Sequence, residues 1–598
     1  MAIKPIKNAE IVKALKELSA FLTALGVAFK PRAYEKAALG IEGMDGELSE
    51  IYEKGGRKAL EDLPGVGKGI AERIEELFKT GKVDDLERLR KKYPVKINEI
   101  TKVEGLGPKM ALNLYKKLGV KTLVDLEKSV KAGKVRNIEG FGQKTEENIL
   151  KGIEFVKESG GRFLLGVAMP EIRKIEERLK NLKEVERLTV AGSVRRWKET
   201  IGDADILVIS KNPGPIMDYF VSMPEVVRVY AHGETKSAVK IKSGLDIDLR
   251  VVEAQSYGAA LNYFTGSKDH NVALREEALK KGLKLNEYGL FSAPQGRDLA
   301  SRQGRGSPEA AGGRGKKMKA GRTEKELYQA LGMDYIEPEM RENTGEIELS
   351  KKHALPPLIN YGDLKGDLQT QTDWTDGSDS IEEMAKAALG QGLKYIAITD
   401  HTKRLAMAHG LDEKKIRRQW VEIDRVQRKL GQKIKILKGT ECDILKDGSL
   451  DLPDEILVKL DIVGVSVHSY FNLTRKEQTE RIIKAIKNPH VDILFHPTGR
   501  LIHHREPYEV DMEAIIREAK QTGTVLEIDA FPDRLDLKDE HIRKCVEAKV
   551  KMSIDSDAHS TAHFPFLEYG LAQARRGWAE KKDIINAWPL DKMLKFLK

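Results

Sequence analysis

Asp203 and Asp205 stand in a stretch whose residue types suit metal binding. The stretch opens with the small-residue turn Gly192-Ser193, continues through the Arg195-Arg196 pair, and ends in the run Ile206–Ile209, which is typical of a buried strand. Side chains alternate along a strand, so both carboxylates project from the same face. Neighbouring carboxylates repel each other unless a cation lies between them. An isolated Asp-x-Asp is more often a solvated surface pair, but this context favours a divalent metal site.

A second strand offers a third carboxylate. Along Leu245–Val252 the apolar residues point to one side, whereas Asp246, Asp248 and Arg250 point to the other. If this strand lies beside the Asp203 strand, a third carboxylate joins the pair. Three converging carboxylates suit two divalent ions that bridge a substrate triphosphate. The other strands expected in this region are residues 188–191, 205–210 and 226–231.

Residues 1 to about 158 have the apolar spacing of helices, and one pattern recurs in them three times. An apolar residue precedes a Gly-x-Gly turn, and a helix follows. The glycines let the backbone approach a ligand closely, and the free N–H groups of a helix N-terminus can bind phosphate. One such turn is common between packed helices, but three resemble the helix-hairpin-helix motif, which grips the nucleic-acid backbone. The residues expected at DNA are Gly65, Gly67, Lys68, Gly105, Gly107, Lys109, Gly140, Gly142 and Lys144.

The net charge of +10 is confined to the first third of the chain, where residues 1–200 hold 41 Lys and Arg against 31 Asp and Glu. A localised basic excess favours a polyanionic partner, most often a nucleic acid, over a merely solvated lysine-rich surface. At 598 residues the chain is too long for one core, and no apolar run is long enough to span a membrane. A chain of this length is expected to form several domains. Its two cysteines give no disulfide framework, so we expect a reducing cytoplasm.

From about residue 360, short apolar strands alternate with helices, which is the order of a parallel α/β barrel. The strands expected are residues 395–399, 434–438, 462–467, 491–495, 524–528 and 551–554. Polar residues follow several of them, and strand ends at one mouth of a barrel are where sites form. A lone histidine there is more often structural, but so many at matching positions favour a second site.

These motifs together resemble family X DNA polymerases of the bacterial and archaeal type over nearly the whole chain. The residues that carry the resemblance are Gly192-Ser193 with Arg196, Gly202-Asp203-Ala-Asp205, Asp246-Ile-Asp248-Leu-Arg250, Tyr263-Phe-Thr-Gly-Ser267 with Asn271, and Asn286-Glu-Tyr288. The resemblance implies a multidomain fold with an all-α helix-hairpin-helix region, an α+β nucleotidyltransferase palm with a fingers- or thumb-type subdomain, and a C-terminal α/β PHP barrel. The domains expected are residues 1–85 and 86–158 (helical, DNA-binding), 159–254 (palm), 255–350 (nucleotide selection) and 360–598 (PHP). Residues 292–322, rich in Gly, Arg, Ser and Ala, are expected to form a flexible loop.

By this resemblance, Asp203, Asp205 and Asp248 hold two Mg²⁺ or Mn²⁺ ions, and Asp248 accepts the proton of the primer 3′-hydroxyl. The residues expected at the incoming dNTP are Ser193, Arg196, Gly202, Tyr263, Phe264, Gly266 and Asn271, and those at the DNA are Arg250 and Arg275. Nucleotidyl transfer gathers negative charge on the α-phosphate and the leaving pyrophosphate, which paired cations and an arginine stabilise. Taken alone, Tyr263 or Arg275 could be an ordinary packing or surface residue.

The PHP domains of this family can hold metal ions and act as 3′→5′ exonucleases or phosphatases, and they open with Asp-Leu-His-x-His. This chain has Asp367-Leu-Gln369-Thr-Gln371, and a neutral amide is a far poorer ligand for Zn²⁺ or Mn²⁺ than an imidazole. We therefore expect a partly vestigial centre that retains some ions. The remaining candidate ligands are Asp376, His401, Glu441, His468, His496, Asp557 and His559.

A second departure follows the first hairpin. Eukaryotic relatives that excise deoxyribose phosphate have a Schiff-base lysine there, and the matching residue in this chain is Arg73. Arginine stays protonated and cannot act as that amine nucleophile. We expect no efficient lyase chemistry through this residue, although Lys68 or Lys36 could substitute.

The resulting hypothesis is a DNA-dependent DNA polymerase that fills short gaps in DNA repair, such as base excision repair. Its expected partners are gapped or primer–template DNA and dNTP, and we expect a monomer in the cytoplasm and at the nucleoid, with no membrane and no protein partner identified. One alternative is a non-catalytic DNA-end-binding scaffold, against which the intact Asp203, Asp205 and Asp248 argue. The other is a nuclease or phosphatase centred on the C-terminal barrel, against which Gln369 and Gln371 argue.

Overall fold

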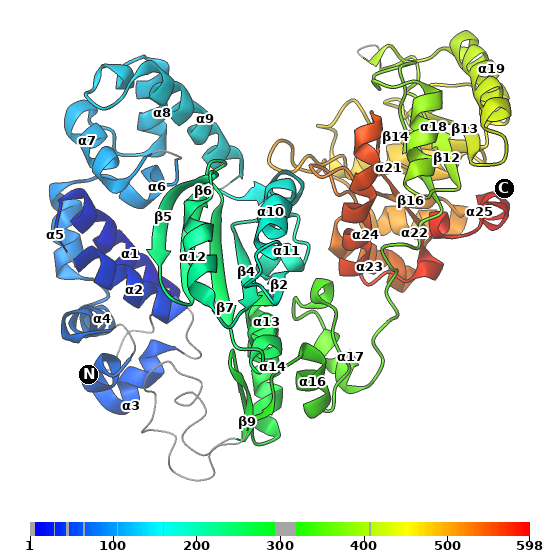
Figure 1. The fold of residues 1–598 in the computed structure, drawn as a ribbon. Coiled ribbons are helices and arrows are strands. Elements are labelled where there is room, and N and C mark those ends of the chain that lie inside the picture. Colours follow the sequence, from blue (N-terminus) through cyan, green and yellow to red (C-terminus); the bar gives the residue numbers. More distant parts are fainter. Residues whose placement is uncertain are drawn as a thin grey trace.

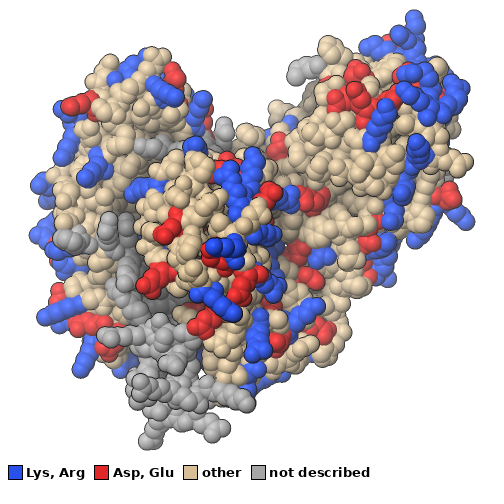
Figure 2. All heavy atoms as spheres, in the orientation of Figure 1, with Lys and Arg blue, Asp and Glu red and all other residues tan. Residues whose placement is uncertain are grey.

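The computed structural model describes residues 6, 8–28, 30–42, 47–63, 66–103, 106–159, 161–292, 318–405 and 408–597. N-terminal helices lie on one side of a central sheet, and a C-terminal α/β unit lies on the other (Figure 1). In the space-filling view a broad notch separates the two (Figure 2). The predicted fold class is confirmed. Within these ranges, no helix is long and apolar enough to cross a membrane.

The N-terminal part is built from amphipathic helices around one core. Its helices are α1 (Asn8–Ala24), α2 (Lys30–Glu42), α3 (Leu48–Glu61), α4 (Lys68–Thr80), α5 (Asp84–Lys92), α6 (Ile97–Ile100), α7 (Pro108–Leu118), α8 (Leu123–Lys131) and α9 (Gln143–Ser159), with a 3₁₀ turn at Val135–Asn137. Buried apolar side chains at helical spacing, such as Ile11, Leu15 and Leu18, supply the core. One apolar cluster runs from Ile6 to Val156, so all three glycine turns belong to one packed unit.

The central sheet has five strands in the order β2-β4-β7-β6-β5. They are β2 (Arg187–Val190), β4 (Asp203–Ile209), β5 (Val226–His232), β6 (Lys236–Ile241) and β7 (Asp246–Val252). Helices α10 (Leu165–Lys180) and α12 (Pro213–Ser222) contribute to the core on one face, where Ile206 and Ile247 are buried. Four of the strands lie within a residue or two of the expected positions, whereas β6 was not among the strands that the sequence predicts.

An α+β subdomain follows the sheet. It comprises α13 (Tyr257–Thr265), α14 (Lys268–Lys280), β8 (Leu283–Asn286), β9 (Gly289–Ser292), β10 (Met318–Ala320), α16 (Glu324–Ala330) and α17 (Glu346–Lys351). The expectation of a flexible loop over 292–322 is wrong at its C-terminal end, because β10 pairs with β9. Met318 packs so closely on Gly289 that a Cβ there would lie 2.7 Å from its sulfur. Residues 293–317 of that loop lie outside the described residues.

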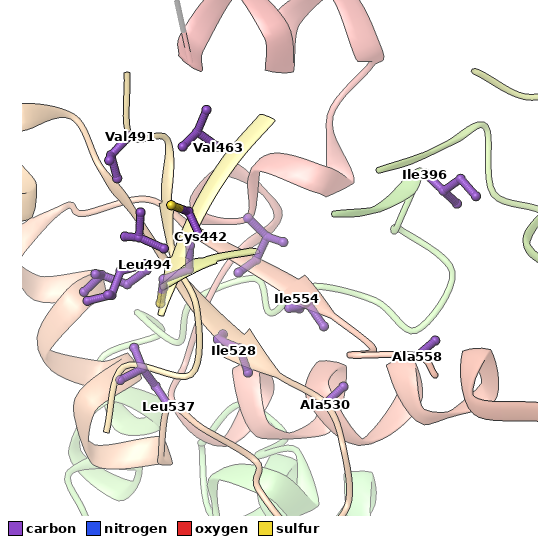
Figure 3. Packing of buried hydrophobic residues seen from close by; sticks show 14 of the residues in the cluster. Ile396, Cys442, Val463, Val491, Leu494, Ile528, Ala530, Leu537, Ile554 and Ala558 are labelled. Atoms are coloured by element: carbon purple, nitrogen blue, oxygen red, sulfur yellow. The ribbon is translucent and has the colours of Figure 1, made fainter. Parts of the chain in front are cut away.

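The C-terminal unit is a seven-stranded parallel sheet in chain order. Its strands are β11 (Gly366–Thr370), β12 (Tyr395–Ile398), β13 (Lys435–Asp443), β14 (Ile462–Ser466), β15 (Ile493–Leu494), β16 (Val525–Asp529) and β17 (Met552–Asp555). A bridge between Thr370 and Ala558 brings the first strand to the last, so the barrel is nearly closed. Its helices are α18 (Ile381–Gly390), α19 (Glu413–Leu430), α20 (Asp454–Leu457), α21 (Arg475–Ile486), α22 (Met512–Thr522), α23 (Asp539–Ala548), α24 (Leu567–Arg576) and α25 (Leu590–Leu597). Cys442, Leu494, Ile528 and Ile554, from different strands, share one apolar cluster (Figure 3).

The C-terminal unit packs directly on the two preceding parts of the chain. Leu535 and Tyr569 join the apolar core of the central sheet, and Trp578 joins the core of the α+β subdomain. Ion pairs cross the same boundary, such as Arg173 with Glu568 and Arg500 with Glu199. The contact is therefore continuous with the cores on both sides.

Candidate functional site

Strands β4 and β7 bring the three predicted metal-binding carboxylates together. The strands pair in parallel, with Asp205 opposite Asp248 and Asp203 opposite Asp246. Burial raises the pKa of Asp205 from 3.8 to about 7, and the charges of Asp203 and Asp248 add to this effect. A carboxylate in such surroundings is stabilised by a bound cation, and oxygen ligands are those that Mg²⁺ prefers. The donor set therefore fits a divalent metal ion.

Lys236 of β6 also reaches this cluster. Its Nζ lies 3.1 Å from Asp248 Oδ2, and an Nη atom of Arg250 lies 3.8 Å from the same oxygen. Arg250 stacks over Phe264, with its guanidinium carbon 4.6 Å from the ring centroid. The sequence did not predict Lys236 as part of this site, because strand β6 was not predicted. The two-residue spacing of Val239 and Ile241 is the signal that could have found this strand.

The turn at Gly192-Ser193 lies against the carboxylates. Gly192 has a φ of +65°, and a Cβ there would lie 2.8 Å from Asp205 Oδ2. Both the backbone conformation and the close approach therefore require glycine. Ser193 is half-buried in the short helix that follows, and Gly202 immediately precedes β4.

Arg196 holds the far side of this turn against the α+β subdomain. Its Nε donates to Glu342 Oε1 at 3.1 Å, and its Nη1 donates to the carbonyl oxygen of Thr265. Gly266 lies beside the same guanidinium, because a Cβ there would be 3.0 Å from Nη1. The structure thus brings together the predicted residues Arg196 and Gly266. Glu342 and Thr265 were not among the candidates.

Helices α13 and α14 place the other predicted nucleotide residues. Asn271 Nδ2 donates to the carbonyl oxygen of Tyr263 at 2.7 Å, and the rings of Tyr263 and Phe264 pack edge to face. Asn271 Oδ1 is buried without a hydrogen-bond partner, so an acceptor is available there. Arg275 lies half-buried on α14.

Arg195, next to the predicted Arg196, is bound into the fold. Its two Nη atoms donate to the carboxylate of Glu324 at 2.9 and 2.6 Å, and buried Arg341 donates to the same carboxylate at 2.6 Å. Burial acts to raise the pKa of Glu324, but Arg341 and Arg195 lower it to about 2. This buried acid is balanced within the protein.

The three glycine turns share one geometry. In each, the N–H of a buried apolar residue donates to the carbonyl of another three positions earlier; the pairs are Val66 to Leu63, Leu106 to Val103 and Phe141 to Ile138. Each turn leads into a helix (α4, α7 or α9), and Lys68, Lys109 and Lys144 are exposed. A Cβ at Gly67, Gly107 or Gly142 would meet no atom within 4 Å. Packing therefore does not explain these glycines, whereas close approach of a ligand does. Gly140 has a φ of +88°, and Gly65 and Gly105 lie outside the described residues.

In the C-terminal barrel, the candidate ligands gather around Glu441. Its Oε1 lies 2.8 Å from His496 Nε2 and 3.0 Å from His468 Nε2, and its Oε2 lies 3.4 Å from His401 Nδ1. Burial acts to raise the pKa of Glu441, but the imidazoles of His401 and His468 hold it well below its usual range. Next to this group, Asp376 Oδ2 lies 3.4 Å from His401 Nε2 and 3.7 Å from His559 Nε2.

Two sets of side chains have ligand atoms within 4.8 Å of one another: Asp376, His401 and His559, and His401, Glu441 and His468. No other such set occurs in the described ranges, so the oxygens of Asp203, Asp205 and Asp248 do not all lie within that distance of one another, although the charges of Asp203 and Asp248 act on Asp205. The glutamines stand where further histidines would be. Gln371 Nε2 donates to Glu441 Oε2 at 2.8 Å, and the amide of Gln369 is buried without a hydrogen-bond partner. The donor chemistry thus fits a metal in two places and not at the glutamines.

Asp557 faces a cation of the protein itself. Arg534 Nε lies 3.6 Å from Asp557 Oδ2 and 3.4 Å from Asp529 Oδ2. Asp443, 3.3 Å from His468 Nδ1, orients that imidazole. The sequence reading missed Arg534, Asp529 and Asp443. Only the position of Asp443 and Asp529 at the ends of their strands could have pointed to them.

In the first hairpin, the side chain of Arg73 forms ion pairs within the protein. Its guanidinium pairs with Asp85 and lies 3.9 Å from Glu76. Lys68 is exposed at the start of α4, and the side chain of Lys36 lies outside the described residues.

Four family models match segments of the chain. They are a helix-hairpin-helix domain over residues 6–83, a SAM-like helix-hairpin-helix tandem over 97–154, a DNA polymerase beta thumb over 260–342 and a PHP domain over 367–584. Together they cover the N-terminal helices, the α+β subdomain and the barrel.

Relatives match in whole or in part. The chain is 36% identical over 592 residues to the DNA polymerase/3′-5′ exonuclease PolX of Bacillus subtilis (strain 168), which covers 98% of this chain and 99% of the relative. It is 27% identical over 364 residues to DNA polymerase lambda of Arabidopsis thaliana, covering 56% of this chain and 62% of the relative. It is 31% identical over 231 residues to a probable phosphatase of Thermoanaerobacter sp. (strain X514), covering 37% of this chain and 88% of the relative.

Proposed function

The chain belongs to the family X DNA polymerases that carry helix-hairpin-helix and PHP domains, and we propose that it fills short gaps during DNA repair. It is a metal-dependent, DNA-directed DNA polymerase of the nucleotidyltransferase class. One observation carries our assignment of its site: the register that sets Asp205 opposite Asp248, with the pKa of Asp205 raised by burial among carboxylates. We assign the polymerase reaction to Asp203, Asp205 and Asp248.

These three aspartates would hold two Mg²⁺ or Mn²⁺ ions. When bound, the ions favour ionisation of the primer 3′-hydroxyl and neutralise charge on the α-phosphate and the leaving pyrophosphate. Asp248 accepts the hydroxyl proton, for which its half-buried position on β7 is suited. Lys236, 3.1 Å from Asp248, offsets part of the mutual repulsion of the carboxylates.

The incoming dNTP would lie between the Gly192 turn and helix α13. In this arrangement Ser193, Gly202 and Arg196 contact the triphosphate, and Arg196 moves a donor from Glu342 to a phosphate oxygen. Tyr263, Phe264 and Gly266 pack against the sugar. Asn271 contacts the base edge through its buried Oδ1.

DNA would reach this site along the three glycine turns, whose exposed lysines and helix N-termini suit backbone phosphates. Arg250 and Arg275 would contact the primer–template near the reacting end. We propose a monomer, because each assigned element comes from one chain, and we propose that it acts at the nucleoid, where the DNA to be repaired would lie.

One primer-extension experiment tests the assignment. On a one-nucleotide gap, the unmodified chain is expected to incorporate the templated dNTP, and Asp205→Ala is expected to abolish incorporation. No incorporation by the unmodified chain would favour a DNA-binding scaffold. A nuclease- or phosphatase-led enzyme would degrade the primer or release phosphate without extending it.

For the PHP domain we propose a partly vestigial centre with two ions and a reduced 3′→5′ exonuclease. The two ligand sets around His401 support this, as do the amides at positions 369 and 371. Metal analysis of the full chain and digestion of a 3′-recessed duplex with Mn²⁺ test it. Brisk digestion that His559→Ala removes would overturn the vestigial assignment.

Deoxyribose-phosphate lyase activity through Arg73 is not expected, since its guanidinium is paired with Asp85 and cannot form a Schiff base. Borohydride trapping on an incised abasic site is the check. A strong covalent adduct that Lys68→Ala removes would show that Lys68 takes this role.

A further inference from the structure

Arg576 belongs to the PHP domain, yet it contacts the polymerase part at Arg196. It ends α24, and only 2% of its side chain is exposed. Its Nη1 donates to the backbone carbonyl oxygen of Arg196 at 2.9 Å and to Glu342 Oε1 at 3.2 Å. The same oxygen of Glu342 accepts from Arg196 Nε. One carboxylate oxygen is therefore shared between an arginine of each domain.

The other side of Arg576 is anchored within its own domain. Its Nη2 donates to Asp539 Oδ2 at 2.5 Å, and Asp539 begins α23. A planar guanidinium held between two carboxylates has little freedom to turn. Through this bridge, helices α23 and α24 of the barrel fix the position of Glu342.

We propose that Arg576 is a positioning residue for the polymerase reaction, through which the PHP domain sets the affinity for dNTP. Glu342 is the carboxylate that Arg196 must release in part to bind the triphosphate. Arg576 offsets part of the negative charge of Glu342, which lowers the free-energy cost of moving Arg196 from Glu342 to a phosphate. Arg576 also holds the backbone of Arg196 through its carbonyl oxygen. This role does not need the metal centre of the barrel. It rests on the proposed role of Arg196.

Steady-state filling of a one-nucleotide gap by the full chain tests the proposal. Arg576→Ala is expected to raise the KM for dNTP about tenfold with kcat changed less than about twofold, because it alters how the triphosphate is bound and not the reacting groups. Arg576→Lys is expected to recover part of the loss, since an ammonium can still pair with Glu342.

Two further variants separate positioning from general loosening of the domains. Arg173→Ala removes another ion pair across the interface, with Glu568 at 2.8 and 2.9 Å, and is expected to leave the KM for dNTP unchanged. The double variant Arg576→Ala/Glu342→Gln is expected to have a lower KM for dNTP than Arg576→Ala alone, because Arg196 then has no charged carboxylate to release. Thermal unfolding of each variant shows that the domains remain folded.

Each contrary outcome has one meaning. An equal rise in KM for Arg173→Ala, or a KM for the double variant at or above that of Arg576→Ala, would overturn the proposal. An unchanged KM in Arg576→Ala would overturn it too, provided that Arg196→Ala raises the KM. If Arg196→Ala leaves the KM unchanged, the proposed role of Arg196 itself fails, and this inference fails with it.

Discussion

The polymerase site and the PHP site both collect acidic side chains at the ends of strands, but they balance the charge in different ways. In the sheet, burial and the charges of Asp203 and Asp248 raise the pKa of Asp205 to about 7, while Lys236 and Arg250 lie near Asp248. In the barrel, histidines surround Glu441 and hold its pKa below the usual range. At the first site burial and repulsion among the carboxylates outweigh the nearby cations at Asp205, whereas at the second the histidines offset the charge of the central acid.

This difference predicts how each site responds to the loss of a ligand. Three aspartates on two strands leave no spare ligand, so one substitution removes the site. The barrel draws its candidate ligands from the ends of several strands, and its two ligand sets share only His401. A centre of that kind can lose two imidazoles and still offer places for ions.

The largest effect is expected for Asp205→Asn. Gap filling should fall about a thousandfold, because an amide binds the ions poorly and their charge stabilisation is lost. Without divalent ions the variant should be at least as thermally stable as the parent, because the repulsion among the carboxylates is relieved. Activity near the parental level would show that the site lies elsewhere. Loss of activity through misfolding would appear as a lower melting temperature.

Glu324 can be compared with Asp205, because it is a buried acid whose charge is neutralised by arginines of the protein. Its pKa is lowered from 4.5 to about 2, so its ionisation contributes about 3 kcal/mol of stability above pH 4.5, which is lost as the pH falls through 2. Glu324→Gln should therefore lower the free energy of unfolding by about 3 kcal/mol at pH 7 and by less at pH 3. Chemical denaturation at both values measures this. Glu348→Gln, an exposed acid paired with Lys351, should change the free energy by less than about 0.5 kcal/mol.

Charge balance also explains what the sequence could and could not predict. Asp203, Asp205 and Asp248 follow from two-residue alternation and one assumption about strand pairing, which the register confirms. The partners that balance them come from elsewhere in the chain. Lys236, beside Asp248, lies on a strand with a weak pattern. Arg576, which plays the same part for Glu342, lies 380 residues from Arg196, whose carbonyl oxygen it also binds. Such contacts depend on how domains pack, and no local spacing encodes them.

The glycine turns were predictable for the opposite reason. Their pattern is local, since each turn closes by a hydrogen bond between residues three apart. The strand β10 was hidden, because Gly- and Arg-rich composition precedes it and its pairing with β9 spans the segment between them. Composition alone therefore could not locate this strand.

Both sites should depend equally on DNA binding by the glycine turns. Replacing Lys68, Lys109 and Lys144 together with Ala is expected to weaken binding to gapped DNA about thirtyfold at physiological salt, and to reduce the salt dependence of binding by about three counterions. Fluorescence anisotropy over a range of salt concentrations measures both. Replacing Lys284, an exposed lysine on β8, with Ala is the matched control. Loss of extension with unchanged DNA affinity would contradict the assignment of the turns.

The smallest effect is expected from restoring histidines in the PHP site, which tests the contrast between the two sites directly. Gln369→His with Gln371→His should add about one metal ion per chain and raise Mn²⁺-dependent digestion of a 3′-recessed duplex about tenfold, because imidazoles replace two buried amides, of which that of Gln371 contacts Glu441. Gap filling should be unchanged, since the polymerase site keeps its own ligands. Metal analysis and digestion rates measure the gain. If neither changes, the glutamines are not what limits the centre, and the pairing of Asp557 with Arg534 becomes the explanation to test by Arg534→Gln in the same background.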